Sequence, residues 1–247
     1  MNPFSLVEKT ILVTGASSGI GRAIAVACSQ SGAKLVITGR NVTRLSETFS
    51  MLEGENHLQI CADLSNFDEL TKLVEELPKV DGVVNNAGIA KPLVLQFTEK
   101  EDVDEVMTIN ALVPIHLTRL IIQHKKLNKS ASLVFISSIN GNNCAYIGSS
   151  VYAASKSALT GFMKAVALEL APRGIRANGI NPGMIETDLL NNASIGAEEL
   201  EADRLKYPLK RYGKPEEVAY AAVYLLSDAT QWITGSSLLI DGGYTLQ

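Results

Sequence analysis

The sequence is poor in the residues that build disulfide frameworks and metal centres. Its 247 residues include only three cysteines and three histidines. The cysteines are scattered without a metal or redox motif, and the histidines have no ligand spacing. We therefore expect buried thiols that pack as small hydrophobic side chains in a reducing cytosol, and no catalytic metal. The six residues are Cys28, Cys61, Cys144, His57, His116 and His124.

Positive charge and long hydrophobic runs are also scarce. Lysine and arginine number 22 against 26 aspartates and glutamates, and the resulting net charge of −4 argues against a nucleic-acid partner. No apolar stretch has the length that a bilayer span requires. The opening MNPFSLVEKT lacks the basic-then-apolar pattern of a secretion signal. These absences predict a cytoplasmic protein with no membrane partner.

Nothing in the sequence divides the chain into parts. It has no Pro/Gly/Ser-rich linker, no charge block and no repeat of fixed period. Hydrophobic residues make up 46% of the chain, which is enough for a large core. We therefore expect residues 1–247 to form a single domain. Within it, residues 186–212 fit the general pattern poorly and are expected to form an insertion that covers the substrate.

Short apolar runs alternate with longer amphipathic segments along the chain. Most runs lack strict period-two alternation, as is typical of parallel strands buried on both faces. This alternation implies right-handed crossovers and predicts an α/β fold: a Rossmann-type doubly wound sheet of about seven parallel strands with helices on both faces. The expected strands are 10–14, 34–38, 57–62, 82–86, 132–137, 175–180 and 236–240, and the expected helices are 19–31, 41–53, 66–77, 99–128, 150–172 and 215–228.

A glycine-rich loop follows the first predicted strand. In TILVTGASSGIGRAIAVAC, the glycines Gly15, Gly19 and Gly21 have the spacing GxxxGxG. Glycine allows a tight turn and a close approach of the backbone, and the following helix N-terminus offers free N–H groups and a positive dipole. The loop stands at the first strand-to-helix turn, where a dinucleotide site belongs. We therefore predict that it binds the pyrophosphate of a dinucleotide.

The end of the second predicted strand indicates which nicotinamide cofactor binds. Enzymes that use NAD place an acidic residue there, which holds the ribose 2′-hydroxyl. This chain has Thr38-Gly39-Arg40 instead. An arginine can bind a 2′-phosphate through charge-assisted hydrogen bonds, whereas a carboxylate would repel it. We therefore predict NADP(H) as the cofactor; the alternative is that Arg40 is an ordinary solvated residue.

A tyrosine and a lysine four residues apart, Tyr152 and Lys156, lie in a predicted helix downstream of Ser138. This spacing brings two side chains onto one helix face, about 6 Å apart along the axis. We expect the ammonium group of Lys156 to lower the pKa of Tyr152 from its free value of about 10. A tyrosine of that kind can exchange a proton near neutral pH. Beside a hydride carrier, this group would interconvert a ketone and an alcohol.

Taken in order, these motifs resemble the short-chain dehydrogenase/reductase family over essentially the whole chain. The matching segments are TGASSGIG (14–21), Asp63-Leu64, NNAG (85–88), Asn110, ISS (136–138), YAASK (152–156), NPGMIET (181–187) and WITG…DGG. The segments PGMIETD, RYGKPEEVA and SLLIDGGY are most similar to β-ketoacyl-acyl-carrier-protein reductases.

The resemblance implies roles for individual residues. Tyr152 is implied to be the general acid, and Ser138 to donate a hydrogen bond to the substrate oxygen. Lys156 is implied to hold the nicotinamide ribose, and Asn110 to anchor a water that relays protons to Lys156. The implied catalytic residues are Asn110, Ser138, Tyr152 and Lys156, and the implied substrate contacts are Ser138, Asn140, Tyr146 and Tyr152. The implied cofactor contacts are Gly15, Ser17, Ser18, Gly19, Ile20, Gly21, Arg40, Asp63, Leu64, Asn86, Ala87, Gly88, Tyr152, Lys156, Pro182, Gly183, Ile185 and Thr187.

One feature of the predicted central helix supports the implied role of Asn110. Pro114 follows four residues later, and a proline has no N–H to donate to the carbonyl four residues before it. We therefore predict that Pro114 kinks the helix and leaves the Asn110 carbonyl free to bind the relay water.

Three functions remain open at this point. The first is NADPH-dependent reduction of a ketone to a secondary alcohol, with a 3-oxoacyl-acyl-carrier-protein as the expected substrate. The second is a dehydrogenase of a sugar, polyol or steroid alcohol, and the third is a catalytically silent NADP-binding scaffold. A carbonyl substrate, free or bound to a carrier protein, is expected in the first case, and the family implies a homotetramer. Basic residues that could dock an acidic carrier protein, or could simply be solvated, are Lys126, Lys129 and Arg173.

Overall fold

A computed structural model describes residues 2–187 and 197–246 of the chain. Among these residues, seven strands pair in parallel as one sheet, in the order β3-β2-β1-β4-β5-β6-β7. The predicted doubly wound α/β fold is therefore confirmed. The strands are β1 (Thr10–Thr14), β2 (Lys34–Gly39), β3 (Leu58–Cys61), β4 (Val80–Asn85), β5 (Leu127–Ile136), β6 (Arg176–Pro182) and β7 (Ser237–Ile240).

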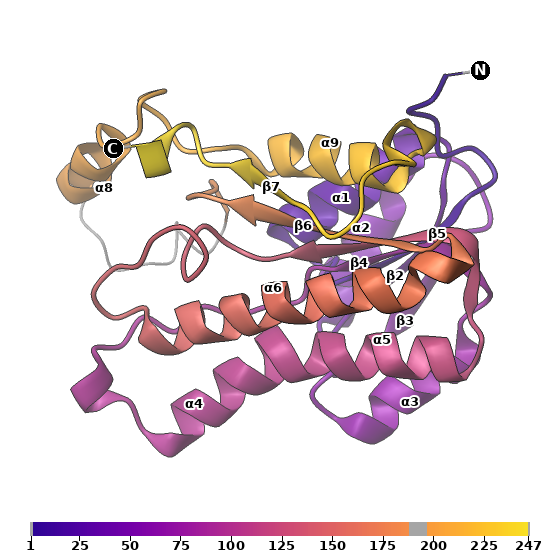
Figure 1. Ribbon diagram of the computed structural model, residues 1–247, viewed down its shortest axis with the longest axis horizontal. Helices are drawn as coiled ribbons and strands as arrows, with labels where there is room; N and C mark the ends of the chain where they lie inside the picture. The colour runs from indigo at the N-terminus through magenta and orange to yellow at the C-terminus, as the bar shows by residue number, and fades with distance from the viewer. Residues whose placement is uncertain (1, 188–196, 247) are drawn as a thin grey trace.

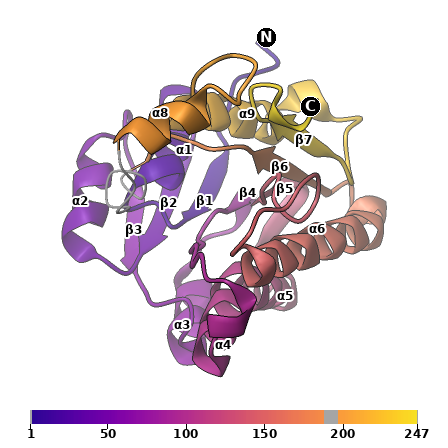
Figure 2. The ribbon, with the colours of Figure 1, turned by 90° about the vertical axis from the view of Figure 1, so that its left-hand side faces the viewer.

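Helices cover both faces of the sheet (Figures 1 and 2). Successive side chains of a strand point to opposite faces. In β1, Ile11 and Val13 pack on the face that carries α1 and α9, whereas Leu12 packs on the face that carries α3, α5 and α6. These two apolar layers explain why the strand sequences are nearly continuous hydrophobic runs. The bounds of these helices and of α2 are α1 (Gly19–Gln30), α2 (Val42–Ser50), α3 (Phe67–Glu76), α5 (Val113–Gln123), α6 (Ser150–Leu170) and α9 (Pro215–Leu226).

The single helix predicted over 99–128 is interrupted. The chain forms α4 (Lys100–Met107), then a widened π-helical turn over Thr108–Leu112, then α5. At the end of this turn the N–H of Val113 donates to the carbonyl of Thr108, five residues back. Because Pro114 has no N–H, the ordinary four-residue register cannot continue across this point. The helical register thus changes just before Pro114, while the predicted kink and the free Asn110 carbonyl stay predictions.

The predicted end of that helix at 128 is wrong. It ends at Gln123, and Lys125 adopts a left-handed backbone conformation with φ +54°. The chain then enters β5 at Leu127, which pairs with Val80 of β4. The polar start of β5, LNKSA, carries no apolar run, so no sequence pattern indicated a strand there.

The helical segment Lys100–Gln123 is long and apolar enough to cross a bilayer, by length and composition alone. The expectation that no stretch reaches this length was therefore wrong. Half of its most apolar window is buried within the fold. Leu117, Leu120 and Ile121 pack in the core beneath the sheet, so the hydropathy of this segment has a structural explanation in a crossover helix.

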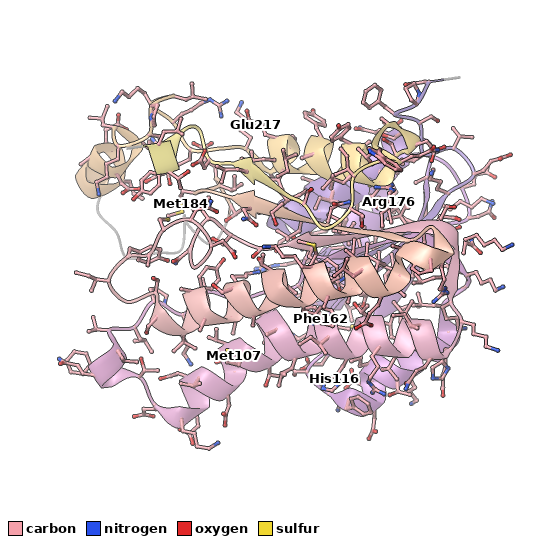
Figure 3. The ribbon with its side chains drawn as sticks, viewed as in Figure 1. Met107, His116, Phe162, Arg176, Met184 and Glu217 are labelled. Carbon is pink, nitrogen blue, oxygen red and sulfur yellow. The ribbon has the colours of Figure 1, made fainter. Side chains whose placement is uncertain are left out.

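The C-terminal part of the chain closes the sheet. Of the predicted insertion 186–212, residues 188–196 lie outside the described residues, and α8 (Ala197–Arg204) follows them. That this segment covers the substrate stays a prediction. Arg176 of β6, labelled in Figure 3, is buried and donates to the carbonyls of Leu225 and Ser227 at the end of α9. Single 3₁₀ turns complete the description: η1 (Leu95–Phe97), η3 (Ala171–Arg173), η4 (Asp228–Thr230) and η5 (Tyr244–Leu246).

Candidate active site

The residues singled out in the sequence gather at the carboxyl edge of the sheet, which is the left-hand side of Figure 1 and faces the viewer in Figure 2. The glycine loop follows β1, Asn86 follows β4, and Ser138 follows β5. Pro182 ends β6, and Tyr152 stands in the first turn of α6. In an open parallel sheet, ligands bind outside this edge where the strand order reverses, here between β1 and β4.

The glycine loop lies directly against the end of β4. Gly15 has φ +63°, and a Cβ atom there would stand 2.9 Å from the Cα of Ala87. A Cβ atom on Gly21 would stand 2.2 Å from the carbonyl oxygen of Gly15. The amide of Asn86 donates to the carbonyls of Thr14 at 2.9 Å and of Gly15 at 3.2 Å. Only glycine fits at these two positions, and the hydrogen bonds of Asn86 hold the loop against the end of β4.

The N-terminus of α1 suits an anion. Ser18 stands at the N-cap position but its side chain makes no cap hydrogen bond, and the first turn, which contains Ile20, holds no acidic residue. Gly19 has φ +53°, and a Cβ atom there would lie 3.3 Å from Thr187. The loop and this helix end therefore fit a pyrophosphate, with Thr187 beside it. Sequence reasoning missed Arg22, which donates to the Ser17 carbonyl at 2.8 Å and braces the loop.

Polar groups also meet beyond the end of β2. Arg40 is exposed, and the side chain of Ser17 packs against Gly39. Burial raises the pKa of Asp63, but hydrogen bonds from Ser65 and the charge of Arg40 outweigh it, so the pKa of Asp63 lies below its ordinary value. Arg40 and Asp63 are thus close enough to interact. The side chain of Leu64 is buried in the core, so its predicted contact with the cofactor could be made only by its backbone.

Ser138, Tyr152 and Lys156 come together as predicted. The Ser138 side chain is buried, hydrogen-bonds the Tyr152 hydroxyl, and its Oγ accepts a hydrogen bond of 3.1 Å from the N–H of Asn140. Lys156 is only 4% exposed. Its Nζ atom donates to the carbonyl of Ile136 at 2.9 Å and lies 5.8 Å from the centroid of the Tyr152 ring.

The expected effect of Lys156 on Tyr152 is not what this geometry gives. Burial raises the pKa of Tyr152, and the hydrogen bond from Ser138 opposes this rise only in part. Burial also lowers the pKa of Lys156 to about 8. The ammonium group is directed at the Ile136 carbonyl rather than at the phenol oxygen. The prediction that Lys156 lowers the pKa of Tyr152 is therefore wrong for this arrangement, because helical spacing fixes the helix face but not the direction of a long side chain.

Asn110 is fully buried in the π-helical turn and joins three segments. Its Oδ1 atom accepts from the N–H of Ile89 at 2.8 Å, and its Nδ2 atom donates to the Ile89 carbonyl at 2.9 Å. The same Nδ2 atom donates to Ser155 at 3.0 Å, and Ser155 donates to the Tyr152 carbonyl. A Cβ atom on Gly88 would lie 3.2 Å from Asn110 and 3.3 Å from the Nζ atom of Lys156. The amide of Asn110 therefore ties the catalytic helix to the loop after β4.

Two of the predicted substrate contacts, Asn140 and Tyr146, lie in the loop 139–149, which we call the substrate loop. Asn140 is buried, and its Oδ1 atom accepts from Ser149 at 3.3 Å. Its Nδ2 atom is buried as well. Tyr146 is 53% exposed. The Asn140 side chain also acts on Tyr146, where its hydrogen bond opposes the rise in pKa that burial causes. A buried amide donor at this place is compatible with a ligand at the site.

The segment after β6 is fixed on the other side. The N–H of Ile139 donates to the Pro182 carbonyl at 3.0 Å, and the N–H of Gly183 donates to the Ile240 carbonyl at 2.8 Å. Ile185 is buried and forms a bridge with Gly213. The N–H of Met184, which is labelled in Figure 3, donates to the hydroxyl of Tyr207 at 3.2 Å. Hydrogen bonds therefore hold the backbone after β6, which contains several of the predicted cofactor contacts, in a fixed position.

Three predicted basic residues lie elsewhere. Lys126 donates to the carbonyls of Glu75 and Leu77, which closes the end of α3. Lys129 and Arg173 line a shallow cleft at the amino edge of the sheet. Arg173 follows α6, whose 21 residues place it about 30 Å from Tyr152. Whether these residues dock an acidic carrier protein or are simply solvated stays a prediction.

Side chains that could ligate a metal do not gather at the site. Across residues 2–187 and 197–246, no group of three or more His, Cys, Asp or Glu side chains is arranged to hold a metal ion.

Comparisons with known proteins agree with this geometry. Residues 15–245 match the family model described as enoyl-(acyl carrier protein) reductase. A 3-oxoacyl-[acyl-carrier-protein] reductase FabG of Rickettsia felis is 37% identical over 96% of this chain and 97% of its own length. A mutant short-chain dehydrogenase/reductase of Serratia marcescens has a TM-score of 0.90 at 31% identity, covering 97% of this chain and 99% of its own.

A second solved structure is a putative 2-deoxy-d-gluconate 3-dehydrogenase from Agrobacterium tumefaciens with bound NADP. It also has a TM-score of 0.90 at 31% identity and covers all of both chains. Sequence and structure thus agree over nearly the full length. The chain belongs to the short-chain dehydrogenase/reductase family of oxidoreductases that act on alcohol and ketone groups, close to the 3-oxoacyl-acyl-carrier-protein reductases.

Proposed function

We propose that the protein reduces a ketone to a secondary alcohol with NADPH, in the manner of a 3-oxoacyl-acyl-carrier-protein reductase. The observation that carries this proposal is the hydrogen-bonded pair of Ser138 and Tyr152 beside the buried ammonium group of Lys156. These three groups lie at the edge of the sheet that also holds the dinucleotide loop. NADPH, when bound, supplies the hydride.

Each side chain has a distinct role in this proposal. The raised pKa of Tyr152 keeps its phenol protonated at neutral pH, so Tyr152 can donate a proton to the substrate oxygen. The Ser138 hydroxyl donates to the same oxygen and stabilises the negative charge that develops on it. Lys156 holds the nicotinamide ribose. Its pKa of about 8 lets it return a proton to Tyr152, and Asn110 holds the relay water through its carbonyl.

The cofactor residues support NADP(H) over NAD(H). Arg40 follows β2 and is exposed, so its guanidinium group can bind a 2′-phosphate. The Agrobacterium neighbour was solved with NADP bound. Gly15 and Gly21 let the loop pack tightly against Ala87 and against itself, and Thr187 lies beside Gly19.

An apolar strip beside the site favours a substrate that carries an apolar chain. The strip consists of Val94, Leu95, Phe97 and Ile147, with exposed fractions between 44% and 88%. The N–H of Leu93 donates to the Gly148 carbonyl at 3.0 Å, which brings the two halves of the strip together. An exposed apolar patch of this kind marks a binding surface. A fatty acyl chain would cover it, whereas a sugar would not.

A sugar, polyol or steroid alcohol is the second candidate substrate, oxidised in the reverse direction. The buried amide of Asn140 favours it, since a second oxygen on the substrate could accept a hydrogen bond from its Nδ2 atom. A silent NADP-binding scaffold is the least supported function, because such a protein has no need of a buried lysine beside a tyrosine and a serine.

The test is NADPH oxidation with acetoacetyl thioesters, keto-sugars, simple ketones and a crotonyl thioester, with NADH in parallel. We expect turnover of the acetoacetyl thioester with NADPH and loss of about 99% of it in Tyr152→Phe, with NADPH affinity retained. Turnover of a keto-sugar alone would keep the mechanism and discard the substrate. Normal turnover in Tyr152→Phe would refute the assignment of the acid.

We also infer that the protein is cytoplasmic and forms a homotetramer. Val103 and Leu112 on the segment α4 to α5, and Leu168 on α6, are exposed apolar side chains that a second subunit could cover. Sedimentation equilibrium should give a mass of four chains; a monomer at micromolar concentration would contradict this.

A further inference from the structure

We propose that Asn142, which lies outside the set of reacting residues, is a positioning residue for the Ser138 hydroxyl. The proposal rests on the proposed function, because it assigns Ser138 to the substrate oxygen. Asn142 belongs to a group of three asparagines in the substrate loop, with Asn140 and Asn143.

Asn142 connects the end of β5 to the catalytic helix. Its Nδ2 atom donates to the Ser138 carbonyl at 3.0 Å and to the Ser137 hydroxyl at 3.1 Å. The Ser137 hydroxyl in turn donates to the carbonyl of Lys156 at 3.0 Å. One side-chain amide therefore holds the backbone of Ser138 and, through one further hydroxyl, the helix turn that carries Lys156.

The loop itself is fixed on the same helix. Gly141 has φ +87°, and a Cβ atom there would stand 2.3 Å from the Ala153 carbonyl. Ser157 donates to the Gly141 carbonyl at 2.8 Å. Because Gly141 packs closely against α6, the backbone of Asn142 is held at a fixed distance from that helix. The two hydrogen bonds of the Asn142 amide therefore start from a fixed backbone position.

Ser138 is consequently held from two sides. Asn142 fixes its carbonyl, and the N–H of Asn140 donates to its Oγ atom at 3.1 Å. The charged and titratable groups that face Tyr152 are Tyr146 from the substrate loop and Lys156 from α6, and neither bonds to Asn142. Loss of the Asn142 donor should therefore reach Tyr152 through Ser138, whose hydrogen bond lowers the pKa of that phenol. A second route runs through Ser137 to the turn of α6 that carries Lys156.

The chain offers a matched control for the experiment. Asn142→Asp keeps the size of the side chain but replaces the donor by an acceptor that faces the Ser138 carbonyl. Asn143→Asp places the same charge on the next residue, but there the Oδ1 atom already accepts from Asn181, and a carboxylate retains that bond. A carboxylate beside Ser138 could itself raise the pKa of Tyr152, so Asn142→Leu, which removes the donor without adding a charge, should give the same shift.

Two readouts separate positioning from a general structural effect. We expect kcat for the acetoacetyl thioester to fall about tenfold or more in Asn142→Asp, with the KM for NADPH within about twofold, and both to stay near wild type in Asn143→Asp. The second readout is the phenolate absorbance of Tyr152, taken as the difference from a Tyr152→Phe partner of each variant. In Asn142→Asp, Tyr152 should titrate about half a pH unit or more above its value in Asn143→Asp.

The two readouts also separate this proposal from the proposed function. If the wild-type protein reduces none of the ketones, the proposed function fails, and the absorbance titration alone decides the role of Asn142. Equal kcat values and equal Tyr152 titrations in the two aspartate variants would overturn the proposal. A crystal structure of Asn142→Asp with Ser138 in place would do the same.

Discussion

Replacement of Lys156 by methionine should remove turnover and yet not weaken the fold near neutral pH. Lys156 is 4% exposed, and burial lowers its pKa from 10.5 to about 8. The difference of about 2.5 units, at about 1.36 kcal/mol per unit, means that burying the charged form costs about 3 kcal/mol. Methionine avoids that penalty but leaves the Ile136 carbonyl without its donor, which costs about 1–3 kcal/mol. At pH 7 we therefore expect Lys156→Met to be as stable as wild type or up to about 2 kcal/mol more stable.

The pH dependence of stability gives the stronger test. Below about pH 8, Lys156 is protonated in both the folded and the unfolded protein, and the penalty is fully present. Between about pH 8 and pH 10.5, the unfolded chain binds a proton that the folded protein has lost, so stability rises with pH. Across this window the free energy of unfolding of the wild-type protein should rise by about 3 kcal/mol relative to that of Lys156→Met.

The assay is urea unfolding of both proteins without cofactor, at half-unit steps from about pH 7 to about pH 10.5. Other lysines, tyrosines and cysteines titrate in the same window, but they do so in both proteins, so the difference between the two free energies of unfolding isolates Lys156. Parallel curves with a constant difference would refute the reasoning, because they would mean that Lys156 titrates alike in the folded and unfolded states.

Three further outcomes follow from the site. Gly21→Ala should abolish cofactor binding, because its Cβ atom would stand 2.2 Å from the Gly15 carbonyl; retention of NADPH affinity in a fluorescence titration would contradict this. Arg40→Asp should raise the KM for NADPH about ten- to a hundredfold and spare NADH, and an unchanged ratio in steady-state kinetics would show that Arg40 does not read the 2′-phosphate. Ile147→Ser should flatten the rise of kcat/KM with acyl chain length, whereas Met51→Ser, also exposed but at the far edge, should not; equal slopes in both would exclude the apolar strip as the chain site.

Much of this architecture could be predicted from the sequence, because the determining signals are local. The apolar runs ILV in β1 and LVI in β2 face two cores and are buried at every position. Positions 15 and 21 require glycine, because a Cβ atom at either one would clash with neighbouring backbone atoms. The order of the motifs along the chain then placed Ser138 and Tyr152 at one edge, because parallel strands bring their carboxyl ends together.

What the sequence could not predict depends on long-range contacts. The direction of the Lys156 side chain is set by the Ile136 carbonyl, which belongs to another element. The turn at Lys125 has a left-handed backbone conformation, and no glycine or asparagine stands at that position to indicate it in the sequence. The hydrogen bonds of Asn142 depend on how closely the substrate loop approaches α6, and the close packing of Gly141 against that helix sets this separation. Polar loop residues have no periodicity from which such partners can be inferred.

The position of β1 next to β4 separates the residues that choose the coenzyme from those that transfer the proton, so evolution can alter each group alone. Arg40 and Asp63 follow β2 and β3 on one side of that junction, whereas Ser138 and Tyr152 belong to the loop after β5 and to α6 on the other. Groups that share no partner and stand well apart contribute additively to free energy. A lineage with this sheet can therefore exchange one coenzyme for another through a few residues beyond β2 without retuning its proton chemistry. New substrates can be acquired at the opposite end of the same edge, in the loops after β5 and β6, while the coenzyme stays the same.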